Sequence, residues 1–310
     1  MTQPLLSFIV VTYNSGGTIA TCLRAIADQT SASYEIVIVD NSPDDATIEE
    51  IRGFVAQYPE VLLHQLRPDE NIGFSRACNL GARRASGKYL FFLNPDTQLM
   101  NDAGAILSDC LEQRPQALAA GPAIFDDEGQ ITRTCRNLPS LFHILLDATG
   151  LDRWWGAYKL TRFAHDRPRM VEQIIGAAIL VRRRDYERLG GMDERFFVYF
   201  EEVDLCKRFK DAGGEIWFWP DAEVRHLAGQ SCEVGRVRAR MIYTLRESRR
   251  KYFAKHFGEA GQLALEVLNR LEAFQKLPVL LALWLLRGER VYRDKASGFW
   301  GVAIGVPPRM

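Results

Sequence analysis

The first hundred residues alternate between short apolar strands and helical segments, and this alternation limits the chain to one class of fold. Strands separated by helices favour a parallel sheet with right-handed crossovers. The strands are apolar almost throughout, as expected when helices cover both faces of the sheet. We therefore predict an α/β fold, with strands at residues 7–12, 34–40, 61–65 and 89–93 and helices at 18–29, 45–58 and 74–85.

Polar residues follow each of these predicted strands. Because ligands of such sheets bind beyond the carboxyl ends of the strands, the polar groups are expected along one rim of a ligand crevice. Asn, Asp, Ser and Gly are also the usual turn residues, which leaves ordinary turn formation as the alternative. The groups are Thr12-Tyr13-Asn14, Asp40-Asn41-Ser42, Glu70-Asn71-Ile72-Gly73 and Asn94-Pro95-Asp96.

Two nucleotide-binding motifs are absent from the sequence. Only the pair Gly16-Gly17 follows the first strand, so the G-x-G-x-x-G fingerprint of dinucleotide-binding folds is missing. No G-x-x-x-x-G-K-[ST] occurs anywhere. These absences argue against a nicotinamide-dependent dehydrogenase and against a P-loop NTPase.

The second half of the chain has a less regular pattern. Gly213-Gly214 marks the end of one predicted helix, and from Gly235 onward the sequence is basic, then amphipathic, and predicted to be mostly helical. The predicted strands here are 117–123, 130–134, 174–181, 215–219 and 223–226, and the predicted helices before Gly235 are 102–113 and 202–212.

The composition gives little reason to expect a nucleic-acid partner, because 39 Lys and Arg residues balance 39 Asp and Glu residues among the 310. Six cysteines lie scattered without metal-ligand spacing, and we expect them to be buried free thiols. The N-terminus has neither the basic region nor the cleavage site of a signal peptide. These features predict a cytoplasmic protein.

One apolar stretch, Leu277–Leu286, is too short to span a bilayer. Arg287, Arg290, Arg293 and Lys295 follow it, so it would suit a membrane surface with its cations toward anionic headgroups. A helix in the protein core is the alternative. The sequence is compatible with both, and the first would make the protein peripheral on the inner face of the cell membrane through residues 277–295.

Asp96 is a candidate metal ligand because it follows a buried strand directly. Mg²⁺ and Mn²⁺ prefer oxygen ligands and keep several positions for phosphate and water. Asn94 supplies a neutral oxygen two residues earlier, on the same side if the strand continues through Pro95. His226, at the end of a predicted strand, could complete such a site as a neutral imidazole, although a lone His is more often structural.

Three acids, Glu201, Glu202 and Asp204, begin the helix that follows the apolar segment 196–200. Carboxylates are favoured at the positive end of the helix dipole, which is a sufficient structural reason for them. A carboxylate set in an apolar wall can also have a raised pKa and act as a general base near neutral pH. The sequence is compatible with both explanations.

Taken in order, several segments resemble the family-2 glycosyltransferases of GT-A fold. Within that family they are most similar to the rhamnosyltransferase-like enzymes of bacterial cell-surface polysaccharide synthesis. The resemblance covers about residues 5–232 and is carried by IVVTYNS, EIVIVDNSPDDAT, NIGFSRACNLGARRASGKYLFFLNPDTQL, GPAIFDDEGQ, GAAILVRRRDYERLGGMDERFFVYFEEVDLCKRFKDAGG and PDAEVRHLAGQS.

The resemblance implies an inverting transfer of a sugar, with L-rhamnose as the subgroup's sugar. The donor would be linked to dTDP, UDP or GDP, and the acceptor would be a hydroxyl of a glycan or a lipid-linked saccharide. Asn94-Pro95-Asp96 stands in the place of the family's D-x-D motif, which implies Mg²⁺ or Mn²⁺ held by Asp96 and His226. Donor binding is implied for Thr12, Tyr13, Asn14, Asp40, Asn71, Gly73, Asn79, Asn94 and Asp96.

The chain departs from the family pattern in two places. The acidic pair usually reads Glu-Asp, with the second member as the expected base, whereas here it reads Glu201-Glu202. The extra methylene requires Glu202 to retract or shift to come within about 2.6–3.2 Å of the acceptor hydroxyl. Gln173 stands where relatives often carry an aromatic residue. We name Glu202 as the base, with Glu201 and Asp204 as further catalytic candidates.

We expect a GT-A catalytic domain at residues 1–232 and a helical, amphipathic region at 233–310. The catalytic domain would divide near residue 115 into a nucleotide-sugar half and an acceptor half. Two other functions are compatible with the sequence. One is another nucleotide-using enzyme, such as a nucleotidyltransferase. The other is a catalytically silent sugar-nucleotide-binding protein, for which the Glu201-Glu202 pair is the only support.

Overall fold

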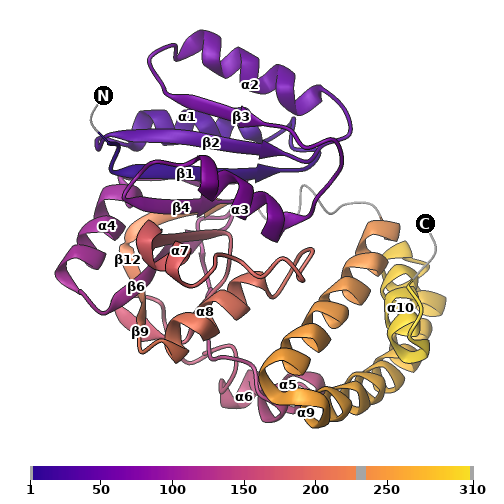
Figure 1. Cartoon of the computed structure of the whole chain (residues 1–310). Coiled ribbons are helices and arrows are strands. Elements are labelled where there is room, and N and C mark those ends of the chain that lie inside the picture. The colour runs from indigo at the N-terminus through magenta and orange to yellow at the C-terminus, as the bar shows by residue number, and fades with distance from the viewer. Residues whose placement is uncertain (1–2, 228–234, 308–310) are drawn as a thin grey trace. The chain divides into compact units, whose positions relative to one another are not determined.

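The computed structural model describes residues 3–227 and 235–307, which form two compact units (Figure 1). We call the first the sheet unit; it comprises Met1–Leu138, Arg162–Phe197 and Glu201–Ala228. The second, the helical unit, comprises Pro139–Thr161, Val198–Phe200 and Gly229–Met310. The expected domain boundary at residue 232 lies outside the described residues, and residues 139–161 and 198–200 group with the C-terminal helices.

The N-terminal half of the sheet unit has the parallel α/β arrangement that the strand and helix alternation predicts. Its strands lie in the order β3-β2-β1-β4, and each neighbouring pair is parallel (Figure 1). β1, β2 and β4 are buried almost throughout and supply much of the core. The strands are β1 (Leu6–Thr12), β2 (Tyr34–Asp40), β3 (Leu63–Leu66) and β4 (Tyr89–Leu93), and the helices are α1 (Ile19–Gln29), α2 (Ala46–Gln57) and α3 (Phe74–Arg84).

Beyond β4 the sheet becomes mixed. β11 (Ala178–Arg182) runs antiparallel to β4 and to β6 (Ala117–Phe125). β12 (Glu215–His226) is parallel to β6 and antiparallel to β5 (Thr97–Leu99). In this last pairing His226 lies opposite Thr97, so the end of β12 lies beside the segment that follows β4.

Short elements complete the sheet unit. β7 (Ile131–Thr132) pairs with β6, and β9 (Arg169–Val171) pairs with β12. β8 (Cys135–Arg136) and β10 (Gln173–Ile174) form a separate ribbon. The helices are α4 (Ala103–Gln113), whose N-terminus is capped by the Asp102 side chain, α7 (Arg183–Arg188) and α8 (Glu201–Asp211).

The prediction of one strand over residues 174–181 is wrong. The run divides into β10 and β11, because the backbone of residues 175–177 forms its hydrogen bonds outside the regular pairing of either strand. Ile175 N–H donates to the Thr134 carbonyl at 3.2 Å, and the Ala177 carbonyl accepts from Asn94 N–H at 2.9 Å. The break therefore brings residues 175–177 to the segment after β4.

The prediction of two strands at residues 215–219 and 223–226 is also wrong, because both belong to β12. The register of β12 against β6 shifts between Trp219 and Glu223. Pro220 lies within this interval and has no N–H to donate to a ladder, which accounts for the interruption that the sequence pattern showed.

The described chain from Gly235 onward is mostly helical, as its sequence predicts. Its long helix α9 (Gly235–Arg287) is two arms joined at Gly258, whose φ of 69° is left-handed. The arms run back along each other, since Arg250 pairs with Glu266 and Arg246 pairs with Glu272. The other helices are α5 (Leu141–Thr149), α6 (Asp152–Trp155) and α10 (Arg290–Ile304).

Most of the apolar stretch Leu277–Leu286 lies outside the protein core. Only Leu277 is buried, whereas Leu285 and Leu286 are 79% and 83% exposed. Among the described residues, no helix is both long enough and apolar enough to cross a membrane.

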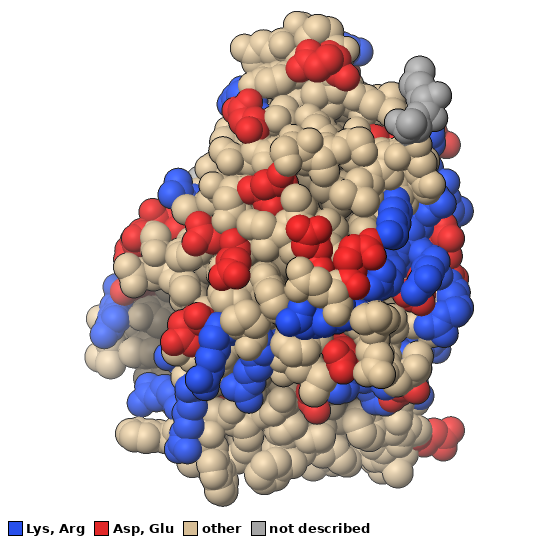
Figure 2. Space-filling model, turned by 90° about the vertical axis from the view of Figure 1, so that its left-hand side faces the viewer, with Lys and Arg blue, Asp and Glu red and all other residues tan. Residues whose placement is uncertain are grey.

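The described cysteines agree with the sequence-based expectation of buried free thiols. Cys22, Cys78, Cys110, Cys135 and Cys206 are buried and free, and Cys232 lies outside the described residues. Acidic and basic side chains are interspersed on the face shown in Figure 2, in keeping with their equal numbers.

Candidate active site

Thr12 and Asp40 lie side by side and fully buried at the carboxyl ends of β1 and β2. Oδ1 of Asp40 accepts hydrogen bonds from the Thr12 hydroxyl at 2.8 Å and from Ser42 N–H at 3.1 Å. Oδ2 of the same carboxylate is buried and accepts no hydrogen bond within the described chain. Because an unsatisfied buried acceptor is costly, this oxygen is suited to a further donor, from a water or from a ligand group.

Tyr13 and Asn14 form the loop that follows β1. Tyr13 is 51% exposed, so its ring can stack on a planar base. Asn14 has a φ of 53°, a left-handed conformation that Asn tolerates better than most residues. Its N–H donates to the Ser42 hydroxyl at 2.8 Å, and this bond ties the loop to the end of β2. The sequence analysis placed Ser42 among the polar groups of the rim but not among the donor-binding residues, and the structure gives it this supporting contact.

Asn71 and Gly73 shape the loop that leads into α3. The Asn71 side-chain oxygen accepts from Gly73 N–H at 2.9 Å. Gly73 has a φ of 82°, and a Cβ there would lie 2.6 Å from the Phe197 ring. The next residue, Phe74, donates its N–H to the Phe197 carbonyl at 2.6 Å. The loop therefore requires glycine both for its conformation and for the close approach of Phe197.

Asn79 has its polar atoms engaged within the protein. Its amide nitrogen donates to the Met192 carbonyl at 2.8 Å and to Glu194 at 3.1 Å. Its oxygen accepts from the Tyr186 hydroxyl at 2.6 Å and from Met192 N–H at 2.9 Å. This network positions the loop around Met192, so the structure gives Asn79 a supporting role where the sequence analysis expected a donor contact.

The Asn94, Asp96 and His226 side chains converge, although 130 positions separate Asp96 from His226. Nε2 of His226 lies 3.1 Å from Oδ1 of Asp96 and 3.5 Å from Nδ2 of Asn94. The pairing of β5 with β12 fixes this arrangement, and Leu227 N–H donates to the Asp96 carbonyl at 2.9 Å. The Asp96 and His226 side chains keep 10% and 18% exposure, which leaves them accessible to a ligand.

These residues fit a divalent cation that is bound mainly through a substrate. Within the described ranges, no group of three or more His, Cys, Asp or Glu side chains could hold a metal. Asp96 and His226 form a pair, with Asn94 beside them. Mg²⁺ and Mn²⁺ in phosphate-binding sites commonly use one or two protein ligands and take the rest from phosphate and water.

Glu201 and Glu202, at the start of α8, both have raised pKa values. Burial raises the pKa of Glu201 well above its ordinary value, and the neighbouring Glu202 raises it further. Burial also raises the pKa of Glu202, against the opposing effects of backbone hydrogen bonds and of Arg136. Glu201 is 5% exposed whereas Glu202 is partly exposed, so Glu202 is the more accessible residue, although Oε2 of each carboxyl group is buried and has no hydrogen-bond partner within the described chain.

The loop at residues 176–177 connects the candidate base to the candidate metal ligands. A Cβ on Gly176 would lie 3.4 Å from Cβ and Cγ of Glu202, so the Glu202 side chain lies directly against Gly176. The next residue, Ala177, accepts the hydrogen bond from Asn94 N–H. The bare backbone of Gly176 thus leaves space for the longer Glu202 side chain, which the sequence analysis did not foresee.

Asp204 is placed differently from Glu202. It is fully buried, and Oδ2 accepts from Arg208 Nε at 2.7 Å. The same guanidinium donates to the carbonyls of Leu189 and Gly191 at 2.8 and 2.7 Å. This ion pair holds α8 to the loop before it, which favours a supporting role for Asp204.

A left-handed turn, formed by Tyr199 and Phe200, immediately precedes the acidic pair. Their φ values are 68° and 69°, which cost energy for non-glycine residues. Within the helical unit, the Ser248 hydroxyl donates a hydrogen bond to the Val198 carbonyl at 2.8 Å. The rings of Tyr252 and Phe200 pack together with their centroids 5.5 Å apart. The sequence contains no glycine or other turn signal here, so the turn was not predictable.

Comparisons with known proteins agree with this arrangement. The family model described as Glycosyl transferase family 2 matches residues 7–190. An N-acetylglucosaminyl-diphospho-decaprenol L-rhamnosyltransferase of Mycobacterium tuberculosis is 30% identical over 244 residues, which cover 73% of this chain and 77% of the relative. A PGL/p-HBAD biosynthesis glycosyltransferase of Mycobacterium bovis is 26% identical over 200 residues, covering 64% and 67%.

Two solved structures share the fold at 17% sequence identity each. A mannosyltransferase of Pyrobaculum calidifontis, solved with GDP-Man and Mn²⁺, has a TM-score of 0.60 and covers 98% of this chain and 87% of its own. GalNAc-T7, solved with UDP, GalNAc and Mn²⁺, has a TM-score of 0.59 and covers 84% of this chain, which spans 52% of the GalNAc-T7 chain. The expected GT-A fold and glycosyltransferase class are thereby confirmed, and the chain belongs to glycosyl transferase family 2.

Proposed function

We propose that this enzyme moves L-rhamnose, with inversion, from a nucleoside-diphosphate donor to a hydroxyl of a lipid-linked saccharide. The observation that carries the proposal is the loop at residues 176–177, which contacts Glu202 on one side and bonds to Asn94 on the other. This connection supports the proposal that a proton acceptor and a diphosphate-binding group serve one reacting centre. The sugar and the acceptor class are taken from the name of the mycobacterial relative.

Donor binding is assigned to the rim of the sheet. Tyr13 would stack on the base, and the free oxygen of Asp40 would accept a hydrogen bond from it. Asn94, Asp96 and His226 lie where the diphosphate would bind. A divalent cation held by Asp96 and His226 would neutralise the negative charge that develops on the leaving diphosphate.

Glu202 is assigned the proton transfer. Its carboxylate takes the proton from the acceptor hydroxyl while the hydroxyl oxygen bonds to the anomeric carbon of the donor. The bond from that carbon to the diphosphate oxygen breaks on the opposite face, so a single displacement inverts the carbon. A raised pKa brings the base closer to the pH at which it operates, which favours general-base catalysis.

The test is incubation of the purified protein with a panel of dTDP-, UDP- and GDP-sugars, with Mg²⁺ or Mn²⁺ and then with a lipid-linked saccharide. We expect slow release of nucleoside diphosphate from one donor and faster release when the acceptor is added. Release of pyrophosphate would instead identify a nucleotidyltransferase. Donor binding without turnover, in the presence of suitable acceptors, would contradict the proposal.

A lipid-linked acceptor implies peripheral contact with a membrane, and the helical unit offers a surface for it. Leu281, Leu285 and Leu286 of α9 are exposed, and the exposed cations Arg287 and Arg290 follow them. Exposed apolar side chains beside cations suit the boundary between acyl chains and anionic headgroups. Replacement of both Leu285 and Leu286 by Gln should reduce flotation with anionic vesicles, and unchanged flotation would remove this part of the proposal.

A further inference from the structure

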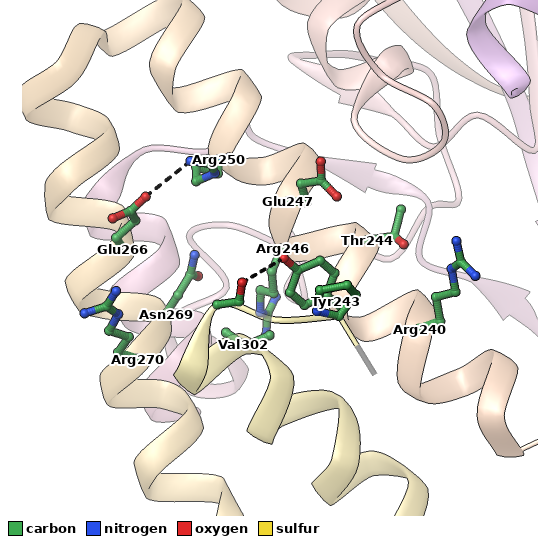
Figure 3. Close-up of a pocket in the computed structure, with 12 residues that line it drawn as sticks. Arg240, Tyr243, Thr244, Arg246, Glu247, Arg250, Glu266, Asn269, Arg270 and Val302 are labelled. Atoms are coloured by element: carbon green, nitrogen blue, oxygen red, sulfur yellow. Dashed lines mark hydrogen bonds and ion pairs between the residues drawn. The ribbon is translucent and has the colours of Figure 1, made fainter. Parts of the chain in front are cut away.

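The helical unit contains a cleft of about 430 Å³ between the two arms of α9 and the end of α10 (Figure 3). The cleft is polar and basic and lies outside the residues assigned to the transfer reaction. Its volume is within the range of small-molecule binding sites. It is lined by Arg240, Tyr243, Thr244, Arg246, Glu247, Arg250, Glu266, Asn269, Arg270, Val302, Gly305 and Pro307.

Positive charge exceeds negative charge in this lining. Four arginines face two glutamates. Glu266 pairs with Arg250 at 3.5 Å, and Glu247 pairs with Lys251 at 3.3 Å. These partly exposed pairs contribute little stability, so an incoming anion can compete with Glu266 for the Arg250 guanidinium group.

A second group of charges lies behind the cleft. The buried Glu272 is shared by Arg246 at 2.5 Å, Lys276 at 2.7 Å and Arg249 at 3.4 Å. Burial acts to raise the pKa of Glu272, yet these cations hold it below its ordinary value. Burial, together with the like charge of Arg246, lowers the pKa of Arg249 to about 9. Asp147, which pairs with Lys159, also lies near Arg246 and Lys276. Even with Asp147 included, the cations of this group outnumber its carboxylates.

Arg240 and Arg270 lie on opposite sides of the cleft in Figure 3. Both are exposed, and within the described ranges neither has an ion pair. The Tyr243 and Thr244 hydroxyls and the Asn269 amide add neutral hydrogen-bonding groups. Guanidinium groups match the geometry of phosphate oxygens, so the lining suits a phosphate or diphosphate better than a carboxylate.

Exposed apolar side chains border the cleft on two sides. Leu263, Val267 and Leu271 are 65%, 52% and 59% exposed, and they follow the helical row next to Glu266 and Arg270. At the end of α10, Ile304 and Val306 are 50% and 53% exposed, next to the lining residue Gly305. A soluble phosphate compound would make no use of these side chains, whereas the chains of a lipid would cover them.

We propose that this cleft binds the phosphate group of a lipid, with the lipid chains lying along the apolar side chains that border it. This inference deepens the proposed membrane contact and rests on it, but it does not depend on the transfer reaction. It gives the helical unit a specific headgroup site, distinct from the general attraction of surface cations to anionic membranes.

The test is flotation of the full-length protein at about 0.15 M salt, where screening weakens non-specific attraction. Vesicles of phosphatidylcholine with and without phosphatidic acid are compared. The test variant is Arg240→Gln with Arg270→Gln. The matched control is Arg24→Gln with Arg52→Gln, which removes the same charge from exposed positions of α1 and α2, outside both the cleft and the proposed membrane-contact surface.

We expect the test variant to bind phosphatidic acid vesicles about 10-fold or more weakly than wild type, with a clearly smaller loss for the control. Inorganic diphosphate should also displace wild type from these vesicles more effectively than chloride at equal ionic strength. Equal losses in the two variants would overturn the proposal. Diphosphate binding without vesicle binding would overturn the assignment to a lipid.

Donor hydrolysis should be unchanged in both variants, so a failure of this inference can be told apart from a failure of the proposed transfer.

Discussion

The sheet unit has two acidic centres, and their surroundings differ. Asp96 lies beside a histidine and an amide, and it keeps 10% side-chain exposure. Glu201 and Glu202 lie at the start of α8 after an apolar segment, and burial raises both pKa values. A carboxylate beside neutral ligands can hold a cation against a diphosphate. A carboxylate with a raised pKa is suited to moving a proton. The environments thus separate two tasks for one kind of functional group.

The same contrast extends to how each centre is built. Asp96 and His226 are fixed by strand pairing, through β5 and β12. Glu202 follows a left-handed turn that contacts on α9 hold in place. If the proposed roles hold, metal binding at Asp96 and His226 should tolerate changes in the helical unit, whereas proton transfer by Glu202 should be sensitive to them. The predictions below test this difference.

The largest expected effect is at Glu202. We expect Glu202→Gln to reduce turnover by about 10²–10⁴-fold, since proton abstraction by a positioned base contributes that much. Donor affinity, measured by calorimetry, should persist. The control Glu187→Gln, at an exposed position of α7, should retain full activity. Because the pKa of Glu202 is raised, the wild-type rate should also fall on the acid side at a higher pH than an ordinary carboxylate would give. Near wild-type turnover in Glu202→Gln would remove the base assignment.

Asp96→Ala tests the other centre. Turnover should fall by about 10³-fold, because the cation supplies several kcal/mol of charge stabilisation. In contrast with Glu202→Gln, the metal-dependent part of donor affinity should be lost as well. Asp127→Ala, on the exposed turn after β6, removes one carboxylate without touching this centre. Unchanged metal-dependent donor binding in Asp96→Ala would contradict the assignment of Asp96 as the metal ligand.

His226→Gln should have an intermediate effect. The imidazole contacts Asp96, and loss of a partner of a metal ligand weakens metal binding by about 10-fold or more. A titration of turnover with Mn²⁺ should therefore shift to higher concentration, with little change in rate at saturation. His64→Gln, on β3, is the control. An identical Mn²⁺ titration for His226→Gln and wild type would exclude His226 from the metal site.

Glu201→Gln should change stability more than catalysis. The pKa of Glu201 is higher in the folded protein than in the unfolded chain. Above pH 4.5 the folded protein therefore retains a proton on Glu201 that the unfolded chain has released. Wild-type unfolding free energy should then fall as pH rises from 4.5 toward the folded-state pKa, by up to about 1.4 kcal/mol per pH unit. The amide cannot ionise, so Glu201→Gln should be the more stable protein on the alkaline side. Urea denaturation at several pH values measures this, and an unchanged slope in the variant would refute it.

Much of the fold and the rim of the site was predictable because the signals are local. Strands β1, β2 and β4 are recognisable in the sequence as apolar runs. Asp40 is the last residue of β2, and Asp96 lies three positions after the end of β4. Parallel pairing then places these strand ends on one edge. The sequence pattern offered His226 only as one possible further ligand, because its neighbour Asp96 is 130 positions away, and the family resemblance then paired the two.

The remaining features depend on contacts between distant segments. The four hydrogen bonds of Asn79 involve Tyr186, Met192 and Glu194, and nothing in the sequence near Asn79 signals them. The role of Gly176 depends on Glu202 packing against it. The arginine-lined cleft exists because α9 bends at Gly258, within a sequence that otherwise reads as one helix. In each case tertiary packing, and not local propensity, determines the outcome.

The smallest expected effect tests whether the helical unit supports the base. Ser248→Ala removes the hydrogen bond to the Val198 carbonyl, which contributes about 0.5–1.5 kcal/mol to holding the left-handed turn before Glu202. We expect turnover to fall a few-fold and the acid limb of the pH profile to shift, since a looser turn changes the surroundings of Glu202. The Mn²⁺ titration should stay unchanged, because strand pairing holds Asp96 and His226 independently. Ser297→Ala, an exposed serine of α10, is the control and should match wild type. A shifted Mn²⁺ titration with an unchanged pH profile would reverse the proposed dependence, and it would mean that the helical unit acts on the metal-binding centre and not on the base.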